Sequence, residues 1–380
     1  FDYETAARLM IMAIALQTAV IVALVGRSLG CSWGSAFAIA PWAAILVQQC
    51  LEPFNQSVGF AQVNTAMMAL VMIDVAAPPS WKGRGVASGL AAAIKLTPAI
   101  AVLIFLLRRQ WRSAITMVAT SLAVTLLSWV ISPGESARFF FDAMWDPQRA
   151  GDAYYAGNQN LKGFVARALP ENAWSITWAI AVVLALVAAV WLCLRIQAAA
   201  TSVVTSRSAS DDVASGLLNT AAPAAPAGDA TETAASDAVA APSAVATSPA
   251  SPALPENLAT LLTAAVIMTL GLLVSPITWS HHWVWGLASV VALIAVALRL
   301  KSAPLAALAL AQGALFIMAP HWWFPYGQVN ELHWSVVKQL VGSSYTLAAI
   351  ASGVALAWAL PVQATARLGW NSLRRTDAPI

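Results

Sequence analysis

The chain has 380 residues, of which 59% are hydrophobic and only 10% are charged, and its mean hydropathy is +0.72. Soluble globular proteins carry about 25% charged residues, so this composition predicts an all-α polytopic membrane protein surrounded by membrane lipids. A net charge of +3 gives no indication of a nucleic-acid partner.

Apolar segments of about 20 residues, the length that a membrane-spanning helix needs, recur along the chain. We predict spans at residues 6–25, 33–50, 63–77, 113–131, 174–196, 257–274, 283–298, 304–319 and 337–360. A long loop, residues 132–173, separates two of these spans.

Residues 86–107 differ from the other apolar segments because basic clusters flank both ends. These clusters contain Lys82, Arg84, Arg108, Arg109 and Arg112. The cytoplasmic side of a membrane protein holds the excess of Lys and Arg, so a single crossing would carry such a cluster at one end only. We therefore predict that the segment enters the membrane, breaks near Pro98 and returns to the same face as a re-entrant hairpin. Lys95 would then lie beside a buried, wet cavity.

The same rule assigns the sides of the other loops. Basic residues at Arg27, Arg195, Arg299 and Lys301 mark cytoplasmic ends, and the crossings are consistent only if 86–107 crosses twice or not at all. The outer loops are then 51–62, 132–173, 275–282 and 320–335. They hold most of the unusual polar residues, so we expect the active site to face outside. Their tryptophans are ordinary for a membrane interface.

Residues 197–256 are rich in Ala, Ser, Thr and Pro and bury too little apolar surface to fold. We predict a disordered cytoplasmic linker there. It separates an N-terminal transmembrane part, residues 1–196, from a C-terminal part, residues 257–366. A basic cytoplasmic tail, residues 367–380, follows.

Lys95 is the leading functional candidate. A charged residue inside the bilayer costs about 2.5–3.5 kcal/mol, and an ammonium group suits a phosphate. His281 and His282 end the run S-P-I-T-W-S-H-H at the outer end of a span and could hold an anion or orient a sugar hydroxyl. The structural alternatives are a lysine that snorkels or pairs with Asp74, and a histidine pair that only lies at the interface.

Amide side chains form a second set of candidates. Asn55, Gln62 and Asn64 bracket the start of a span, and Asn158 and Gln159 lie in the long outer loop with Arg167 downstream. Amides both donate and accept, which suits hydroxyl-rich ligands, although a capped helix or an ordinary surface loop would use them equally well. The chain has no P-loop, and its three cysteines lack metal-ligand spacing, so we expect no metal and no cofactor. Gly85 and Gly89 indicate close helix packing.

Three blocks of sequence resemble glycosyltransferase family 87, which belongs to the GT-C superfamily of membrane glycosyltransferases and occurs in actinobacteria. They are Q-V-N-T-A-M-M-A-L at 62–70, G-L-A-A-A-I-K-L-T-P at 89–98 followed by L-L-R-R-Q-W-R, and S-P-I-T-W-S-H-H-W-V-W at 275–285. The run G-N-Q-N-L-K-G at 157–163 is similar to the family's N-Q-S-x-x-G, with Asn160 in place of serine. The resemblance covers most of the chain except the linker.

The resemblance implies a GT-C-type transmembrane bundle in the plasma membrane. It implies inverting transfer of a sugar, usually mannose, from a polyprenyl-phosphate-sugar donor to a glycolipid acceptor on the outer face. The expected acceptor is a phosphatidylinositol mannoside, lipomannan or lipoarabinomannan, with an α-1,2 linkage. The residues expected to contact the donor phosphate are Lys95, His281, His282 and Arg167. Those expected to contact the donor sugar or the acceptor are Asn55, Gln62, Asn64, Asn158 and Gln159.

The catalytic base is left unassigned. In the superfamily it is a carboxylate in the first outer loop, and the resemblance implies that this loop and the first span precede residue 1, with Asp2 too near the start to assign. Three other functions remain open at this point: arabinofuranosyl transfer within the same family, a flippase or transporter for lipid-linked sugar, and a non-catalytic scaffold. Broken helices with charges at mid-membrane also occur in transporters.

Overall fold

The structure is a computed structural model that describes residues 2–145, 151–219 and 254–360. The described residues contain no strand beyond a single bridge between Asn158 and Trp279. The α-helices are α1 (Tyr3–Ser28), α2 (Trp33–Cys50), α3 (Glu52–Gly59), α4 (Asn64–Ala76), α5 (Val86–Ile94), α6 (Val102–Leu107), α7 (Trp111–Ile131), α8 (Pro133–Arg138), α9 (Leu161–Ala168), α10 (Trp174–Asn219), α11 (Glu256–Val274), α12 (Gly286–Leu300), α13 (Ala303–Met318), α14 (Val336–Gly342) and α15 (Ser344–Ala359).

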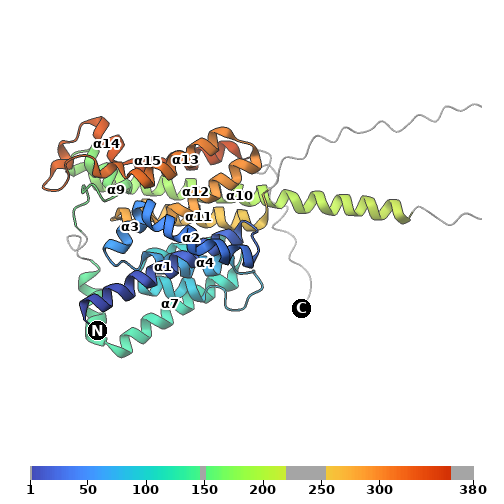
Figure 1. Ribbon diagram of the computed structural model, residues 1–380, viewed down its shortest axis with the longest axis horizontal. Coiled ribbons are helices and arrows are strands. Elements are labelled where there is room, and N and C mark those ends of the chain that lie inside the picture. Colours follow the sequence, from blue (N-terminus) through green and yellow to red (C-terminus); the bar gives the residue numbers. More distant parts are fainter. Residues whose placement is uncertain (1, 146–150, 220–253, 361–380) are drawn as a thin grey trace, which may run out of the picture.

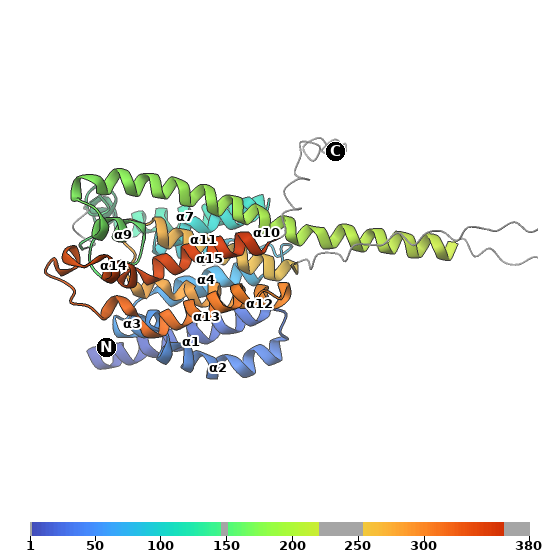
Figure 2. The same cartoon turned by 90° about the horizontal axis from the view of Figure 1, so that it is seen from above.

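The long helices form one bundle (Figures 1 and 2). Six stretches of the described chain are long and apolar enough to cross a membrane. Two bent helix pairs, α2 with α3 and α14 with α15, raise that number to as many as eight. These findings confirm the expected all-α polytopic membrane protein.

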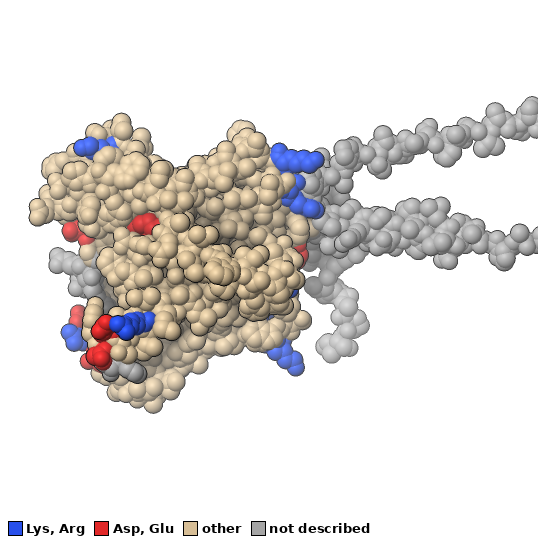
Figure 3. Space-filling view, viewed as in Figure 1, with Lys and Arg blue, Asp and Glu red and all other residues tan. Residues whose placement is uncertain are grey.

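The bundle has two chemically different ends. Figure 3 shows Lys and Arg side chains gathered at the end from which α10 projects, whereas most acidic side chains lie toward the other end, together with a few basic ones. Helices α3, α9 and α14 lie at that second end in both cartoon views. We call it the distal end, because it lies away from the projecting part of α10.

The segment 86–107 is a hairpin, as predicted. Its two halves are α5 and the run formed by a 3₁₀ helix, η1 (Thr97–Ala101), and α6. The Arg84 guanidinium lies 5.5 Å from the centroid of the Phe105 ring, and Arg112 donates to the carbonyl of Lys82 at 3.3 Å, so both ends of the segment lie together. The turn lies at Lys95, whose backbone is extended (φ −144°, ψ 129°).

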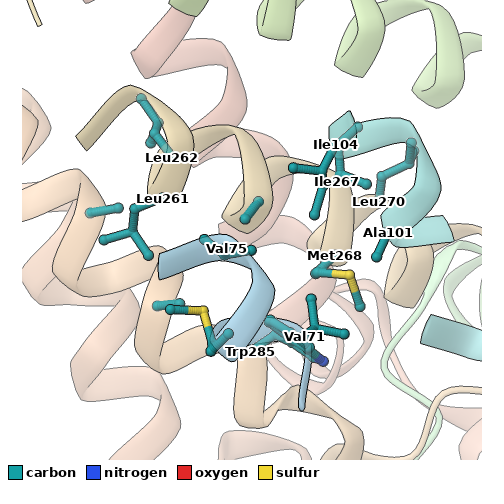
Figure 4. Close-up of a cluster of buried hydrophobic side chains, with 14 of the residues drawn as sticks. Val71, Val75, Ala101, Ile104, Leu261, Leu262, Ile267, Met268, Leu270 and Trp285 are labelled. Carbon is teal, nitrogen blue, oxygen red and sulfur yellow. The ribbon is translucent and has the colours of Figure 1, made fainter. Parts of the chain in front are cut away.

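The hairpin is part of the main core rather than an appendage. Figure 4 shows Val71 and Val75 of α4 and Ile104 of α6 packed with Leu270 and other residues of α11. Pro98 lies in the first turn of η1, where no preceding helical turn needs the N–H group that proline lacks. Packing on α11 therefore fixes the position of the turn that carries Lys95.

Gly89 allows α5 to lie directly on α7, as the sequence indicated. A Cβ added at Gly89 would lie 2.5 Å from the Met117 carbonyl oxygen and 2.7 Å from the Thr120 Cβ. We expect Gly89→Ala to destabilise the protein by about 1–3 kcal/mol through overpacking. Thermal unfolding of the purified protein in detergent micelles measures the change.

The matched control is Gly353→Ala in α15, where a Cβ would meet nothing within 4 Å. Its stability should be unchanged or slightly higher, because alanine reduces the entropy of the unfolded chain. A Gly89→Ala protein as stable as wild type would contradict the close contact of α5 with α7.

Residues 337–360 were predicted to form one span, and the structure shows that this span is bent. The segment bends by 72° between α14 and α15, at Ser343. A side chain from a distant loop satisfies the backbone groups at this break, because Gln159 donates to the Gly342 carbonyl at 2.7 Å and accepts from the Tyr345 N–H at 3.3 Å. This contact across 183 residues has no local signal in the sequence.

The expected linker and tail fall mostly outside the described chain. Helix α10 continues past residue 196 to Asn219, so the first part of the segment 197–256 is helical. Residues 220–253 and the tail 367–380 lie outside the described residues.

Candidate active site

Lys95 is the centre of a polar cluster inside the bundle. Its ammonium donates to Asn64 Oδ1 at 2.9 Å and lies 3.1 Å from His282 Nε2. Asn64 is the first residue of α4, and His282 belongs to a 3₁₀ helix, η5 (Ser280–Trp285), that opens α12. Segments far apart in the chain therefore converge on one cation.

The contact with Lys95 determines the role of the His282 ring. An ammonium group has only donors, so His282 Nε2 accepts and the ring is neutral, with its proton on Nδ1. The His281 ring lies next to it, with centroids 4.7 Å apart in an edge-on arrangement. Both rings lie near the ammonium without neutralising it, which leaves its charge available to an anion.

The backbone of the histidine pair is anchored by two polar side chains. The carbonyl of His281 accepts from Asn64 Nδ2 at 3.1 Å and from the Ser57 hydroxyl at 3.1 Å. Asn64 is buried and therefore uses both ends of its amide, one on Lys95 and the other on the histidine segment. This is the physical reason for an amide, rather than an acid or an alcohol, at this position.

The alternative role of Lys95 as an ion-pair partner of Asp74 does not fit the structure. Asp74 lies toward the other end of α5, where its Oδ2 accepts from the Ser88 N–H at 2.7 Å and its carbonyl accepts from Arg84 at 2.7 Å. Asp74 therefore holds the start of the hairpin rather than its turn.

A cavity of about 540 Å³ opens beside the cluster. This volume lies within the range of about 300–1,000 Å³ that is usual for ligand sites. Four of the residues singled out from the sequence line it: Gln62, Lys95, His281 and His282. The others on its wall include four aromatic residues, Phe60, Tyr155, Trp279 and Trp322.

Asn158 and Gln159 are not on the cavity wall, in contrast to our expectation. Both are fully buried. Asn158 donates to the Ala153 carbonyl at 2.8 Å and accepts from the Thr278 N–H at 2.9 Å, so it joins the outer loop to the segment that leads into η5. These amides satisfy backbone groups, and we assign them to positioning of the loop instead of sugar contact.

Arg167 also lies away from the cavity. It is buried, and its guanidinium donates to the carbonyls of Tyr154, Tyr155 and Asn158 and to the hydroxyl of Ser343 at 2.9 Å. Burial lowers the pKa of Arg167 to about 10, and the nearby Glu331 opposes this shift. Arg167 thus holds the outer loop together and does not line this cavity.

Arg167→Lys should lower the free energy of unfolding by about 2 kcal/mol or more. The planar guanidinium of Arg167 donates to three carbonyls and a hydroxyl, and a single ammonium group cannot reach all four. Arg138→Lys at the exposed end of α8 is the matched control and should change stability by less than about 0.5 kcal/mol. Thermal unfolding of both variants gives the comparison. Equal stability of Arg167→Lys and wild type would contradict the structural role.

Asn55 is exposed on α3 and does not line the cavity. The neighbouring residue Glu52, which we did not select from the sequence, contacts the cavity wall instead. Its carboxylate accepts from the Ser280 hydroxyl at 2.6 Å, the Trp322 indole N–H at 3.0 Å and the Tyr345 hydroxyl at 3.0 Å. Both oxygens are therefore occupied, which suits a residue that positions the wall better than one that takes up a proton.

The described residues contain no group of three His, Cys, Asp or Glu side chains that is placed to hold a metal ion. The described part of the cavity offers an anion one lysine and two histidines, and it offers a hydroxyl-bearing ligand an amide and aromatic surfaces. This combination suits a ligand that joins a phosphate to a sugar.

Comparisons with known proteins agree with this chemistry. The profile of glycosyltransferase family 87 matches residues 1–210. A polyprenol-phosphate-mannose-dependent alpha-(1-2)-phosphatidylinositol mannoside mannosyltransferase from Mycolicibacterium smegmatis is 28% identical over 350 residues, which are 92% of this chain and 66% of that protein. A protein of the same description from Mycobacterium tuberculosis is 28% identical and covers 82% of this chain and 60% of its own length.

A third relative from Mycolicibacterium smegmatis is a polyprenol-phosphate-mannose-dependent alpha-(1-2)-phosphatidylinositol pentamannoside mannosyltransferase, 27% identical over 68% of this chain and 47% of its own length. The chain thus spans less than two thirds of the length of these curated relatives. No solved structure matches it.

Proposed function

The chain belongs to glycosyltransferase family 87, and from that membership we propose that it is a hexosyltransferase. It transfers mannose from polyprenol-phosphate-mannose to a phosphatidylinositol mannoside and forms an α-1,2 linkage. The names of its relatives support both substrates and the linkage. The observation that carries the proposal is the Lys95 ammonium, held by Asn64 and His282 at the wall of a cavity in an apolar bundle.

The proposed reaction breaks the bond between the anomeric carbon of mannose and the phosphate oxygen of the donor. A hydroxyl of the acceptor gives its proton to a carboxylate general base, which is unassigned in this chain, and forms the new bond to the same carbon from the opposite face, with inversion. Negative charge grows on the departing phosphate. A preorganised cation in a site of low dielectric stabilises such a charge most strongly in the transition state, and Lys95 has this role.

The lipid chain of the donor approaches through the membrane. The residues on either side of Lys95, Ile94 and Leu96, are 54% and 72% exposed, whereas Lys95 itself turns toward the cavity. Apolar surface outside and a cation inside suit a polyprenyl phosphate, whose chain stays in lipid while its phosphate enters the protein. The same arrangement explains why a charged side chain is tolerated at the turn of the hairpin.

The cavity faces the outside of the plasma membrane in this proposal. Cytoplasmic ends of membrane proteins collect Lys and Arg, and these residues gather where α10 projects (Figure 3). The loops that build the cavity lie at the distal end (Figures 1 and 2). The acceptor glycolipid would therefore enter from the outer leaflet.

A transfer assay with two donors tests the proposal. The protein, expressed from its whole gene and purified into lipid nanodiscs, is given a phosphatidylinositol mannoside with either polyprenyl-phosphate-mannose or polyprenyl-phosphate-arabinose. We expect product only from the mannose donor, and we expect nuclear magnetic resonance to show a new α-1,2 linkage. Transfer of arabinose alone would replace the proposed donor with the arabinose one. Movement of intact donor between leaflets without any product would indicate a transporter.

A further inference from the structure

Three aromatic rings gather on the cavity wall beside the cationic cluster. The Tyr155 ring lies 5.6 Å from the Trp279 ring and 6.0 Å from the Trp322 ring, in edge-on arrangements. They belong to the outer loop before α9, to the segment before η5, and to a 3₁₀ helix, η6 (Pro320–Trp322), after α13. The fold therefore brings rings from three distant segments to the same cavity that contains Lys95.

Glycines in the outer loop leave the room that these rings need. A Cβ at Gly157 would lie 2.9 Å from a ring carbon of Trp322 and 3.1 Å from one of Tyr155. A Cβ at Gly151, which has φ +85°, would lie 3.2 Å from a ring carbon of Trp279. The loop thus packs against both indoles at van der Waals distance, so the rings form a rigid wall.

The two indoles differ in the use of their N–H groups. The Trp322 N–H donates to Glu52, a carboxylate that is also held by Ser280 and Tyr345. The Trp279 N–H has no hydrogen-bond partner among the described residues, although Trp279 is half-buried on the cavity wall. Buried tryptophan N–H groups usually have a hydrogen-bond partner. Because the Trp279 N–H has none within the described protein, it is available to a ligand.

The backbone connects this wall directly to the phosphate-binding cluster. Trp279 precedes η5, and the His282 N–H donates back to the Trp279 carbonyl at 2.8 Å. A sugar bonded to a phosphate at Lys95 lies within a few ångströms of that phosphate. It must therefore occupy the same cavity, of which Trp279, Trp322 and Tyr155 form one wall.

We propose that Trp279, Trp322 and Tyr155 form the platform that binds the donor's sugar ring, and that the Trp279 N–H donates to one of its hydroxyls. The inference rests on the proposed function and adds the sugar-binding half of the donor site. A pyranose ring has an apolar C–H face and a polar edge, which match a π-face and a free N–H. The platform selects the sugar, whereas Lys95 binds the phosphate that all polyprenyl-phosphate donors share.

The test compares two ligands that differ only by the sugar. Equilibrium binding of polyprenyl-phosphate-mannose and of polyprenyl phosphate is measured by native mass spectrometry for the protein in nanodiscs. We expect Trp279→Leu to weaken binding of the mannose donor about tenfold or more and to change binding of polyprenyl phosphate less than twofold. Trp279→Phe keeps a ring but loses the N–H, and we expect an intermediate loss.

Two further variants separate recognition from packing. Trp323→Leu removes an indole beside Trp322 that is 58% exposed and not on the cavity wall, so it should change neither affinity. Gly157→Ala displaces the Trp322 ring and should weaken the mannose donor selectively, as Trp279→Leu does.

Equal losses for both ligands in Trp279→Leu and Gly157→Ala, or no loss in either, would overturn the platform. So would an unchanged donor affinity with a raised KM for the acceptor, because the rings would then hold the acceptor sugar. Transfer by the wild-type protein is measured in the same preparation. If mannose transfer is present and the selective loss is absent, only the platform is wrong. If wild-type protein neither binds nor transfers the mannose donor, the proposed function is wrong as well.

Discussion

Lys95→Met should lower kcat/KM for mannose transfer about 100- to 1,000-fold. Methionine keeps most of the length of the side chain but removes the ammonium that lies 2.9 Å from Asn64 Oδ1 and 3.1 Å from His282 Nε2. Loss of one preorganised donor to a developing anion costs about 10²–10³ in rate. The loss should appear in kcat as well as in KM, because charge on the phosphate is greatest in the transition state.

Two control variants show whether the loss is specific to the positive charge at residue 95. Lys95→Arg keeps the charge and should retain part of the activity, although a planar guanidinium fits a site for a compact ammonium poorly. Lys162→Met removes a lysine of the outer loop that lies over the Trp178 ring and does not reach the cavity, and it should retain activity within about twofold. Steady-state transfer rates of folded, purified variants decide the matter. Full activity of Lys95→Met would remove the phosphate role of this residue.

Asn64→Asp should lower kcat about 10- to 100-fold without unfolding the protein. The new carboxylate keeps an acceptor for the Lys95 ammonium but pairs with its charge, so the phosphate meets a neutralised site. The other carboxylate oxygen would face the His281 carbonyl, which now accepts from the Asn64 amide at 3.1 Å. Repulsion between these oxygens should also loosen the histidine segment.

The corresponding control changes an amide to an acid at an exposed site. Asn330→Asp lies in the distal loops, where the Asn330 amide bonds only to the nearby Gly327 carbonyl, and should leave transfer unchanged. Asn64→Asp is assayed beside it with the same donor concentrations, and near-ultraviolet circular dichroism checks that both variants remain folded. Equal rates for the two variants would show that the charge of Lys95 does not drive the reaction.

The hairpin and its lysine were predictable from the sequence because their signals are local. Basic residues at both ends of 86–107 and a proline after Lys95 are sufficient to indicate a segment that returns to its starting face. The family resemblance implied that Lys95 and His282 contact the same donor phosphate, and this role stays a prediction. Their nitrogens lie 3.1 Å apart, so the fold brings both residues to one place.

The outer loop was less predictable because an amide has the same chemistry toward a ligand and toward a peptide group. Asn158 and Gln159 looked like sugar contacts in sequence, yet their partners are the backbone of Ala153, Thr278, Gly342 and Tyr345. A bend such as the one at Ser343 leaves backbone groups unpaired. Only the structure shows which groups these are and which side chains bind them.

Glu52 and the aromatic wall were missed for a related reason. An acidic residue at the start of a helix is usually explained by its favourable interaction with the helix dipole, so Glu52 did not stand out in the sequence. Its contact with Ser280 spans 228 residues and has no local signal. The chain has 17 tryptophans, and most tryptophans of membrane proteins lie at the interface, so no local pattern separates Trp279 and Trp322 from the others. Trp279 and Trp322 are distinguished from the other tryptophans only in the structure, where both line the same cavity.

The decisive experiment is a structure of the protein with bound polyprenyl-phosphate-mannose, or with a non-transferable analogue of it. We expect a phosphate oxygen within about 2.7–3.2 Å of Lys95 Nζ, in the cavity shared with His281 and His282. A phosphate bound elsewhere in the bundle, with Lys95 turned to lipid or to the basic end, would contradict it.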